Sequence, residues 1–169
     1  MAFQERELNK EEITQLKSDN RYGFKLLEIK KRDATAREIC HQLEYVVQEL
    51  QNDFRAGTRR ADAQESVEIA FALGATWGNQ LVKEFGWTWI CIEANGVENY
   101  VVASGNRSVF VAPAPFIKLC IDKPDTRCNI LFAFDLIDGG SLDSLTENGY
   151  ANLMVSLQQA ANQPTQPSR

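Results

Sequence analysis

The sequence predicts an α+β fold, with N-terminal helices and a central amphipathic helix packed on a small antiparallel β-meander, followed by C-terminal helices. Apolar residues recur at three- and four-residue steps through 24–54 and 63–85, which is typical of helices with one buried face. The period changes to two over 87–112, where aromatic and β-branched residues predict strands. Helical patterns return beyond residue 113, so helices should cover one face of the sheet.

The chain has 169 residues, of which 44% are hydrophobic and 24% charged, as in a globular domain with or without an added helical arm. We divide it into a helical N-terminal segment (1–60), an α+β core domain (61–161) and a disordered tail (162–169). No apolar run is long enough to cross a bilayer, and the charged N-terminus lacks the apolar stretch of a signal peptide. We therefore expect no membrane association and a cytoplasmic location.

The N-terminal segment is predicted to be helical. Asn9 and Glu12 have the spacing of a capping box, which marks a helix start, and the polar stretch 18–23 predicts a turn. Neither glycine nor proline interrupts 24–56, which predicts one long helix or two helices joined near residue 32. Gly57 should end this helical region.

The central helix carries two glycines four residues apart. Asp62 with Glu65 predicts its start and Gly86 its end. A glycine inside a helix costs about 1 kcal/mol relative to alanine, so Gly74 and Gly78 need a compensating interaction. We favour a notch that admits a neighbouring element and bulky aromatic side chains, and a ligand notch is the alternative.

Three strands should follow, joined by short turns: 87–94, 97–104 and 108–112. The Asn95-Gly96 pair is typical of a two-residue hairpin turn. Because side chains alternate along a strand, Trp87 and Trp89 should point to one face of the sheet and Thr88 to the other.

The C-terminal third predicts short helices. Prolines favour a helix start at residue 113. The apolar stretch 129–137 suits a helix capped by Asn129, with a buried strand as the alternative. Residues 150–161 predict a final amphipathic helix.

No catalytic, cofactor or metal motif is visible. Cys40, Cys91, Cys120 and Cys128 are too widely spaced for a structural zinc site, and buried small hydrophobes are their expected role. His41 adjoins Cys40, but neighbours on a helix point about 100° apart and cannot form a dyad. His41 should therefore face solvent. We expect no catalytic residues, no cofactor and no bound metal.

The charge is uneven along the chain. Residues 1–60 carry 12 Lys and Arg against 11 Asp and Glu, whereas residues 61–169 carry 6 against 12. An acidic second half repels nucleic acid and anionic membranes and suits a basic protein partner. The acidic loops downstream are the predicted contact surface: Asp122, Asp125, Asp135, Asp138, Asp143 and Glu147. Their spacing does not match a calcium-binding loop.

One resemblance emerges from the motif Leu73-Gly74-x-x-x-Gly78-x-x-Leu81, followed by Gly86-x-x-Trp89 and strands that lead to a proline-led helix. This pattern, over Val67–Ile121, resembles a family of small bacterial domains of unknown function that look like the immunity proteins encoded beside secreted toxins. The resemblance implies a protein that binds its toxin and blocks it, with no catalysis of its own.

The sequence thus favours a non-enzymatic protein-binding module, most concretely an immunity protein against a basic, nuclease-type toxin. One alternative is an enzyme with an unrecognised carboxylate or cysteine site. Another is a structural or adaptor protein that self-associates through its N-terminal helices. Apolar residues at seven-residue spacing motivate that last alternative: Ile29, Ala36, Leu43 and Leu50.

Overall fold

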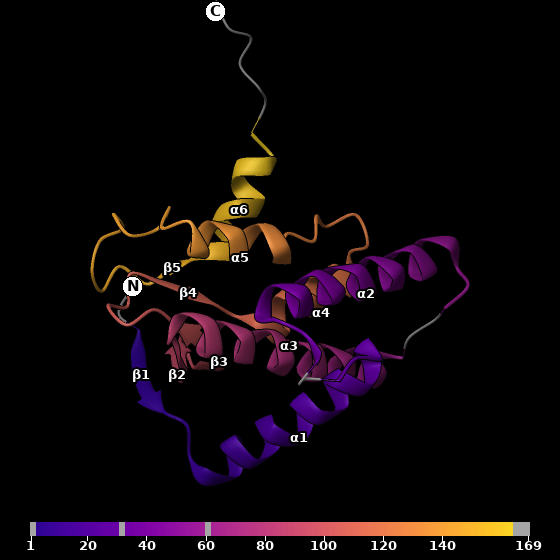
Figure 1. Ribbon diagram of the computed structural model, residues 1–169, viewed down its shortest axis with the longest axis horizontal. Coiled ribbons are helices and arrows are strands. Elements are labelled where there is room, and N and C mark those ends of the chain that lie inside the picture. Colours follow the sequence, from indigo (N-terminus) through magenta and orange to yellow (C-terminus); the bar gives the residue numbers. More distant parts are fainter. Residues whose placement is uncertain (1–2, 31–32, 60–61, 164–169) are drawn as a thin grey trace, which may run out of the picture.

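A central helix organises the protein, shown as a ribbon in Figure 1. The structure, a computed structural model, describes residues 3–30, 33–59 and 62–163. Within these residues, helix α3 (Ala63–Phe85) packs chiefly against four other helices. These are α1 (Lys10–Leu27), α2 (Ala36–Ala56), α4 (Pro113–Asp122) and α5 (Ile130–Asp138). The predicted α+β fold is confirmed.

The described parts of the chain form one sheet of five strands, which lie in sequence order. They are β1 (Gln4–Glu7), β2 (Thr88–Ala94), β3 (Val97–Ala103), β4 (Val109–Val111) and β5 (Ala151–Asn152). Neighbours pair antiparallel except β4 and β5, which are parallel. The predicted meander is therefore confirmed as β2–β4, and Asn95 and Gly96 both take the positive φ angles of its hairpin turn. The two edge strands were not predicted, because β1 is fully polar and exposed and β5 has only two residues.

The two faces of the sheet are buried differently. Trp87, Trp89 and Val102 pack with the helices in the main core, so the predicted common side of the two tryptophans is confirmed. The opposite face holds a second apolar cluster: Ile90, Ile92, Val101, Ala103 and Phe110. Side chains connect the two edges of the sheet across this second face, although β1 and β5 are not paired with each other. Glu5 of β1 accepts hydrogen bonds from Arg107 and Tyr150, and these contacts help to close the cluster.

The turn predicted at 18–23 is wrong, because α1 runs unbroken through it. The helix begins with the predicted capping box, in which Asn9 and Glu12 bond each other's backbone N–H groups. Gly23 is buried, and a methyl group there would overlap Thr76 Oγ1 and the carbonyl oxygen of Ala72 on α3. Its glycine is needed for close helix packing and not for a turn.

The stretch 24–56 forms two helices. The chain leaves α1 at Glu28, which has a left-handed φ of 56°, and re-enters helix after Thr35, whose capping box with Glu38 starts α2. Gly57 ends α2 with φ 71°, as predicted. Four apolar residues recur at seven-residue spacing in this stretch. Ala36, Leu43 and Leu50 are buried in the main core, and Ile29 packs against it. Packing within one chain therefore accounts for this spacing.

The C-terminal region resolves the remaining ambiguity. The stretch 129–137 is the helix α5, although Asn129 makes no side-chain capping bond. The last helix, α6 (Leu153–Ala161), begins later than predicted, because Tyr150 has φ 46° and the next two residues pair with β4. The predicted tail lies outside the described residues from 164 onward. Over the described parts of the chain, we find no helix of the length and hydropathy that spanning a bilayer requires.

Candidate functional site

A concave pocket of about 490 Å³ lies where α1, α3, the β2–β3 hairpin and the start of α4 meet. Most of its exposed lining is apolar, and carboxylates lie around it. Its lining residues are Glu11, Glu12, Gln15, Leu16, Asp19, Phe71, Gly74, Ala75, Trp89, Glu98, Asn99, Tyr100, Ala114 and Pro115. A mostly apolar cavity with a few polar groups is the usual form of a binding site in proteins.

Small residues of α3 and α4 line one part of the pocket. A methyl group on Gly74 would lie 2.7 Å from the backbone nitrogen of Ala114 and 2.8 Å from its Cα atom, so α4 starts directly against α3. At Gly78 a methyl group would overlap the indole ring of Trp89. The favoured packing explanation of both glycines is therefore supported, and Gly74 also borders the pocket.

Trp89 connects the sheet to α3 and forms part of the pocket wall. Its Nε1–H donates to Oδ1 of Asn79, 2.9 Å away, while its ring occupies the notch at Gly78. On α3 itself, Phe71 remains 43% exposed although it belongs to the central helix. Trp89 and Phe71 thus border the same cavity, to which Tyr100 adds a third aromatic ring; Trp89 is fixed by packing, and Phe71 is accessible to solvent.

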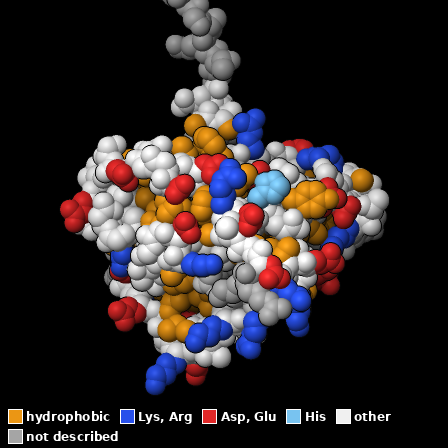
Figure 2. All heavy atoms as spheres, viewed as in Figure 1, with side chains coloured by type: hydrophobic (Ala, Val, Ile, Leu, Met, Phe, Trp, Pro, Cys, Tyr) orange, Lys and Arg blue, Asp and Glu red, His pale blue; other side chains and the backbone are white. Residues whose placement is uncertain are grey.

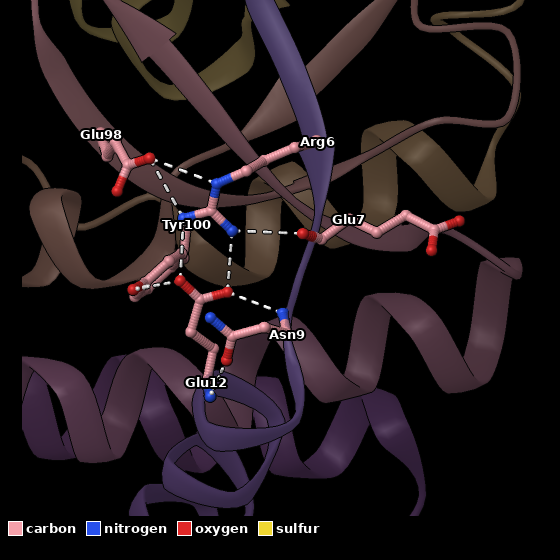
Figure 3. Close-up of polar contacts among 6 residues, drawn as sticks. All are labelled: Arg6, Glu7, Asn9, Glu12, Glu98 and Tyr100. Atoms are coloured by element: carbon pink, nitrogen blue, oxygen red, sulfur yellow. Dashed lines mark hydrogen bonds and ion pairs between the residues drawn. The ribbon is translucent and has the colours of Figure 1, made fainter.

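Glu12 is the centre of a polar network beside the pocket (Figure 3). Arg6 of β1 donates two hydrogen bonds to its carboxylate, at 2.9 and 2.8 Å. The backbone N–H of Asn9 and the hydroxyl of Tyr100 donate two more, at 2.8 and 3.0 Å. The Arg6 hydrogen bonds are the main reason that the pKa of Glu12 falls to about 2, so this carboxylate stays ionised.

The network connects β1, α1 and β3. Besides its bonds to Glu12, Arg6 donates to Oε1 of Glu98 from both Nε and Nη2, at 3.2 and 3.1 Å. Figure 3 shows Arg6 between the carboxylates of Glu12 and Glu98. The hydroxyl of Tyr100, on β3, donates to the same Glu12 carboxylate. Through this arrangement the unpredicted edge strand holds the beginning of α1 next to the sheet, and that placement shapes the pocket.

Two other carboxylates of the pocket have spare hydrogen-bonding capacity. Asp19 is half-buried, and Gln15 donates to its Oδ1 at 2.9 Å, while Oδ2 has no donor among the described residues. Burial raises the pKa of Asp19, because the charged form loses contact with water. Glu11 is exposed and makes no side-chain hydrogen bond within the described structure. Both could accept a donor from a bound group.

The four cysteines lie inside the protein. All four side chains are buried, and none of them forms a disulfide bond. Burial raises the pKa of Cys40 and Cys91, and a hydrogen bond with Cys120 together with burial raises that of Cys128. Buried thiols of raised pKa lack the thiolate that nucleophilic catalysis requires. The expectation of buried cysteines is confirmed, and His41 is exposed, as predicted.

The predicted acidic surface is dispersed. Asp125 pairs with Arg55 and Asp135 with Arg37, at opposite ends of α2. These arginines are 18 residues apart, which is about 27 Å along a helix. Asp122 pairs with Lys118 on α4. The remaining three residues are Asp138, at the end of α5, and Asp143 and Glu147 in the loop that follows. The predicted loop placement is therefore wrong for Asp122, Asp135 and Asp138, because the apolar residues around them form the buried faces of α4 and α5.

Ion pairing therefore reduces the charge of half of this set. On the face shown in Figure 2, acidic and basic side chains are interspersed with apolar ones. None of the six predicted residues lines the pocket. Whether they contact a partner remains a prediction of the sequence.

Sequence reasoning missed the pocket because its lining comes from separate parts of the chain. The glycine motif predicts a notch on the central helix, but the sequence does not show which other segment lies against that notch. One usable signal was the helical spacing of Glu12, Gln15, Leu16 and Asp19, which places polar and apolar groups on one face of α1. The spacing does not show which elements lie opposite this face of α1, because that depends on the three-dimensional structure.

Comparisons with protein-family models, with curated proteins and with solved structures found no match.

Proposed function

We propose that this chain is a non-enzymatic protein-binding module that holds a basic partner at the pocket between α1, α3 and the β2–β3 hairpin. In its most concrete form the proposal is a bacterial immunity protein that binds and blocks a toxin in the cytoplasm. The observation that carries the binding role is the pocket itself, a mostly apolar cavity of about 490 Å³ with four carboxylates in its lining. Apolar surface gives affinity, and the carboxylates favour a basic partner over an acidic one.

Two observations weaken the alternatives. The buried cysteines count against a cysteine-based enzyme. The seven-residue apolar spacing of the N-terminal helices is used for packing within the chain, which removes the reason for expecting self-association through it. The immunity role itself still derives from the sequence resemblance, and the pocket supports it only by suggesting where a partner binds.

Site-specific photocrosslinking tests the proposal. A photoreactive phenylalanine analogue replaces Phe71, which lines the pocket and is 43% exposed, or Phe132, which is 54% exposed on α5 outside the pocket. Irradiation in the source cells should yield one protein adduct from position 71 and none from position 132. The captured protein, produced alone, should stop growth, and co-production of the chain should restore it.

Adducts at both positions in equal yield, or at neither, would reject the pocket as the contact surface. A specific adduct at position 71 with a protein that does not affect growth would support binding and reject the immunity role. The six acidic residues predicted from the sequence are tested separately with the captured partner. Neutralising their six carboxylates should slow association and reduce its dependence on salt if that surface contributes.

A further inference from the structure

We propose that the pocket binds a lysine or arginine side chain of the partner, with its aliphatic part against Phe71 and Trp89 and its positive charge on Asp19. This inference rests on the proposed protein-binding function and names the chemical group that the site receives. It depends on three features of the pocket: its charge, its apolar surface and one carboxylate oxygen that accepts no hydrogen bond from the described residues.

The charge of the pocket selects a cation. Its lining contains Glu11, Glu12, Asp19 and Glu98, and no lysine, arginine or histidine among the residues that the structure describes lines it. Arg6 is the cation that contacts two of these carboxylates. Four negative charges and one positive charge leave a formal charge of −3, which repels anionic groups and attracts cationic ones.

The four carboxylates are not equivalent. Glu12 receives four hydrogen bonds from protein groups, and Glu98 shares Arg6 with it. Asp19 is half-buried and accepts one bond at Oδ1, so its Oδ2 is the acceptor that a bound donor would find. A cation at this position would also offset the unfavourable burial of the Asp19 charge.

A metal ion does not fit the same pattern. Over the described residues, no three or more His, Cys, Asp or Glu side chains converge as metal ligands do. Glu11 and Asp19 are eight residues apart on α1, which places them about 12 Å apart along the helix. Carboxylates spread along a groove suit an organic cation that carries its own hydrocarbon chain.

The apolar surface accounts for that hydrocarbon chain. Phe71, Trp89 and Leu16 line the cavity together with the small residues of α3 and α4. Lysine and arginine bury their methylene groups on apolar surface while the charged end stays near polar groups, and aromatic rings attract the charge itself. Neutral apolar side chains would gain nothing from the carboxylates, so the combined lining favours a basic residue.

The test uses the full-length chain and its tryptophan indole signals in nitrogen-15 NMR. The chain has three tryptophans, and Trp89 lines the pocket, whereas Trp87 and Trp77 do not. Acetyl-lysine methylamide should shift the Trp89 indole signal in a saturable way and leave the Trp87 signal in place. Acetyl-norleucine methylamide, which lacks the charge, should cause no saturable shift.

Two variants assign the carboxylate. Asp19→Asn removes the proposed acceptor, and Asp53→Asn removes the same charge from an exposed site on α2 outside the pocket. Asp19→Asn should raise the Kd for acetyl-lysine methylamide about fivefold to tenfold, since a hydrogen-bonded ion pair of this kind contributes about 1 kcal/mol. Asp53→Asn should leave the Kd unchanged. Dispersed NMR spectra of both variants establish that they are folded.

Several outcomes would overturn the inference. These are equal shifts with the lysine and norleucine compounds, equal Kd values for the two variants, or no shift of the Trp89 signal. A Kd for 1,5-diaminopentane more than about tenfold below that for the lysine compound would identify a free diamine as the occupant. If the lysine compound fails while position 71 still crosslinks a protein, the inference fails and the proposed function stands. If it binds but position 71 captures no protein, the proposed function fails.

Discussion

Replacing Gly74 with alanine tests the closest helix contact beside the pocket. A methyl group at this position would lie 2.7, 2.8 and 3.0 Å from the N, Cα and Cβ atoms of Ala114. Ordinary contacts of a Cβ atom begin near 3.4 Å, so the start of α4 must move away by roughly 0.4–0.7 Å. Two of the three contacts are with backbone atoms, so a side-chain rotation cannot relieve them.

Two opposing terms set the expected magnitude. Overpacking of this kind costs about 1–3 kcal/mol, and the backbone contact places Gly74→Ala in the upper part of that range. Alanine gains about 1 kcal/mol over glycine inside a helix. The net expectation is a loss of about 1–2 kcal/mol in unfolding free energy, which is about 2–8 °C in Tm for a chain of this size.

Urea denaturation followed by circular dichroism measures this difference. Ser18→Ala provides the control, because Ser18 is exposed inside α1 and its replacement isolates the gain in helix propensity. That control should change stability by less than about 0.5 kcal/mol. If Gly74→Ala proved as stable as the parent chain or more so, the close approach of α3 and α4 could not be the reason for glycine at this position.

Three further predictions concern the edge strands and a helix end. Glu12 should stabilise the fold relative to Glu12→Gln, because the pKa of its carboxyl is lowered from 4.5 to about 2 in the folded state. This difference in stability should be full above about pH 5 and should vanish as the pH falls from about 4.5 to about 2. Urea unfolding midpoints of the two proteins, measured across this pH range, give the difference. Tyr150→Phe removes the hydroxyl bonded to Glu5, and amide exchange in β1 should accelerate about threefold to tenfold by hydrogen-exchange NMR, whereas unchanged exchange would show that this bond does not hold β1. Gly86→Ala should cost about 1 kcal/mol in thermal unfolding, because Gly86 ends α3 with φ 68°, and an unchanged Tm would contradict that strain.

Local patterns predicted most of the secondary structure because the relevant forces act between residues near in sequence. Capping boxes, glycines at helix ends and the Asn95-Gly96 turn are set by backbone hydrogen bonds and φ angles, and the structure confirms the examples at Asn9, Gly57 and Gly86. Gly23 shows the limit of this reasoning. The polar residues before it suggest a turn, but the decisive interaction is with α3, about fifty residues further along the chain.

The edge strands show the same limit for β structure. Strand β1 has no apolar alternation, since its four residues are all exposed and polar. It is held by backbone pairing with β2 and by ion pairs of Arg6 and of Glu5. Neither contribution leaves a periodic pattern, so β1 could not be predicted from its own residues.

The pocket and the six acidic residues predicted from the sequence place the negatively charged contact surface in different parts of the chain. The sequence placed the functional charge in the second half, where acidic residues outnumber basic ones by six. Residues 1–60 are nearly neutral in sum, yet they supply Glu11, Glu12 and Asp19 to the pocket. None of the basic residues described in this segment lines the pocket, and Arg6 is held beside it by Glu12 and Glu98. The net charge of a segment therefore does not reveal a locally negative surface when charges of one sign lie on one face of a helix. The side of α1 that faces α3 is where a basic partner should be sought first.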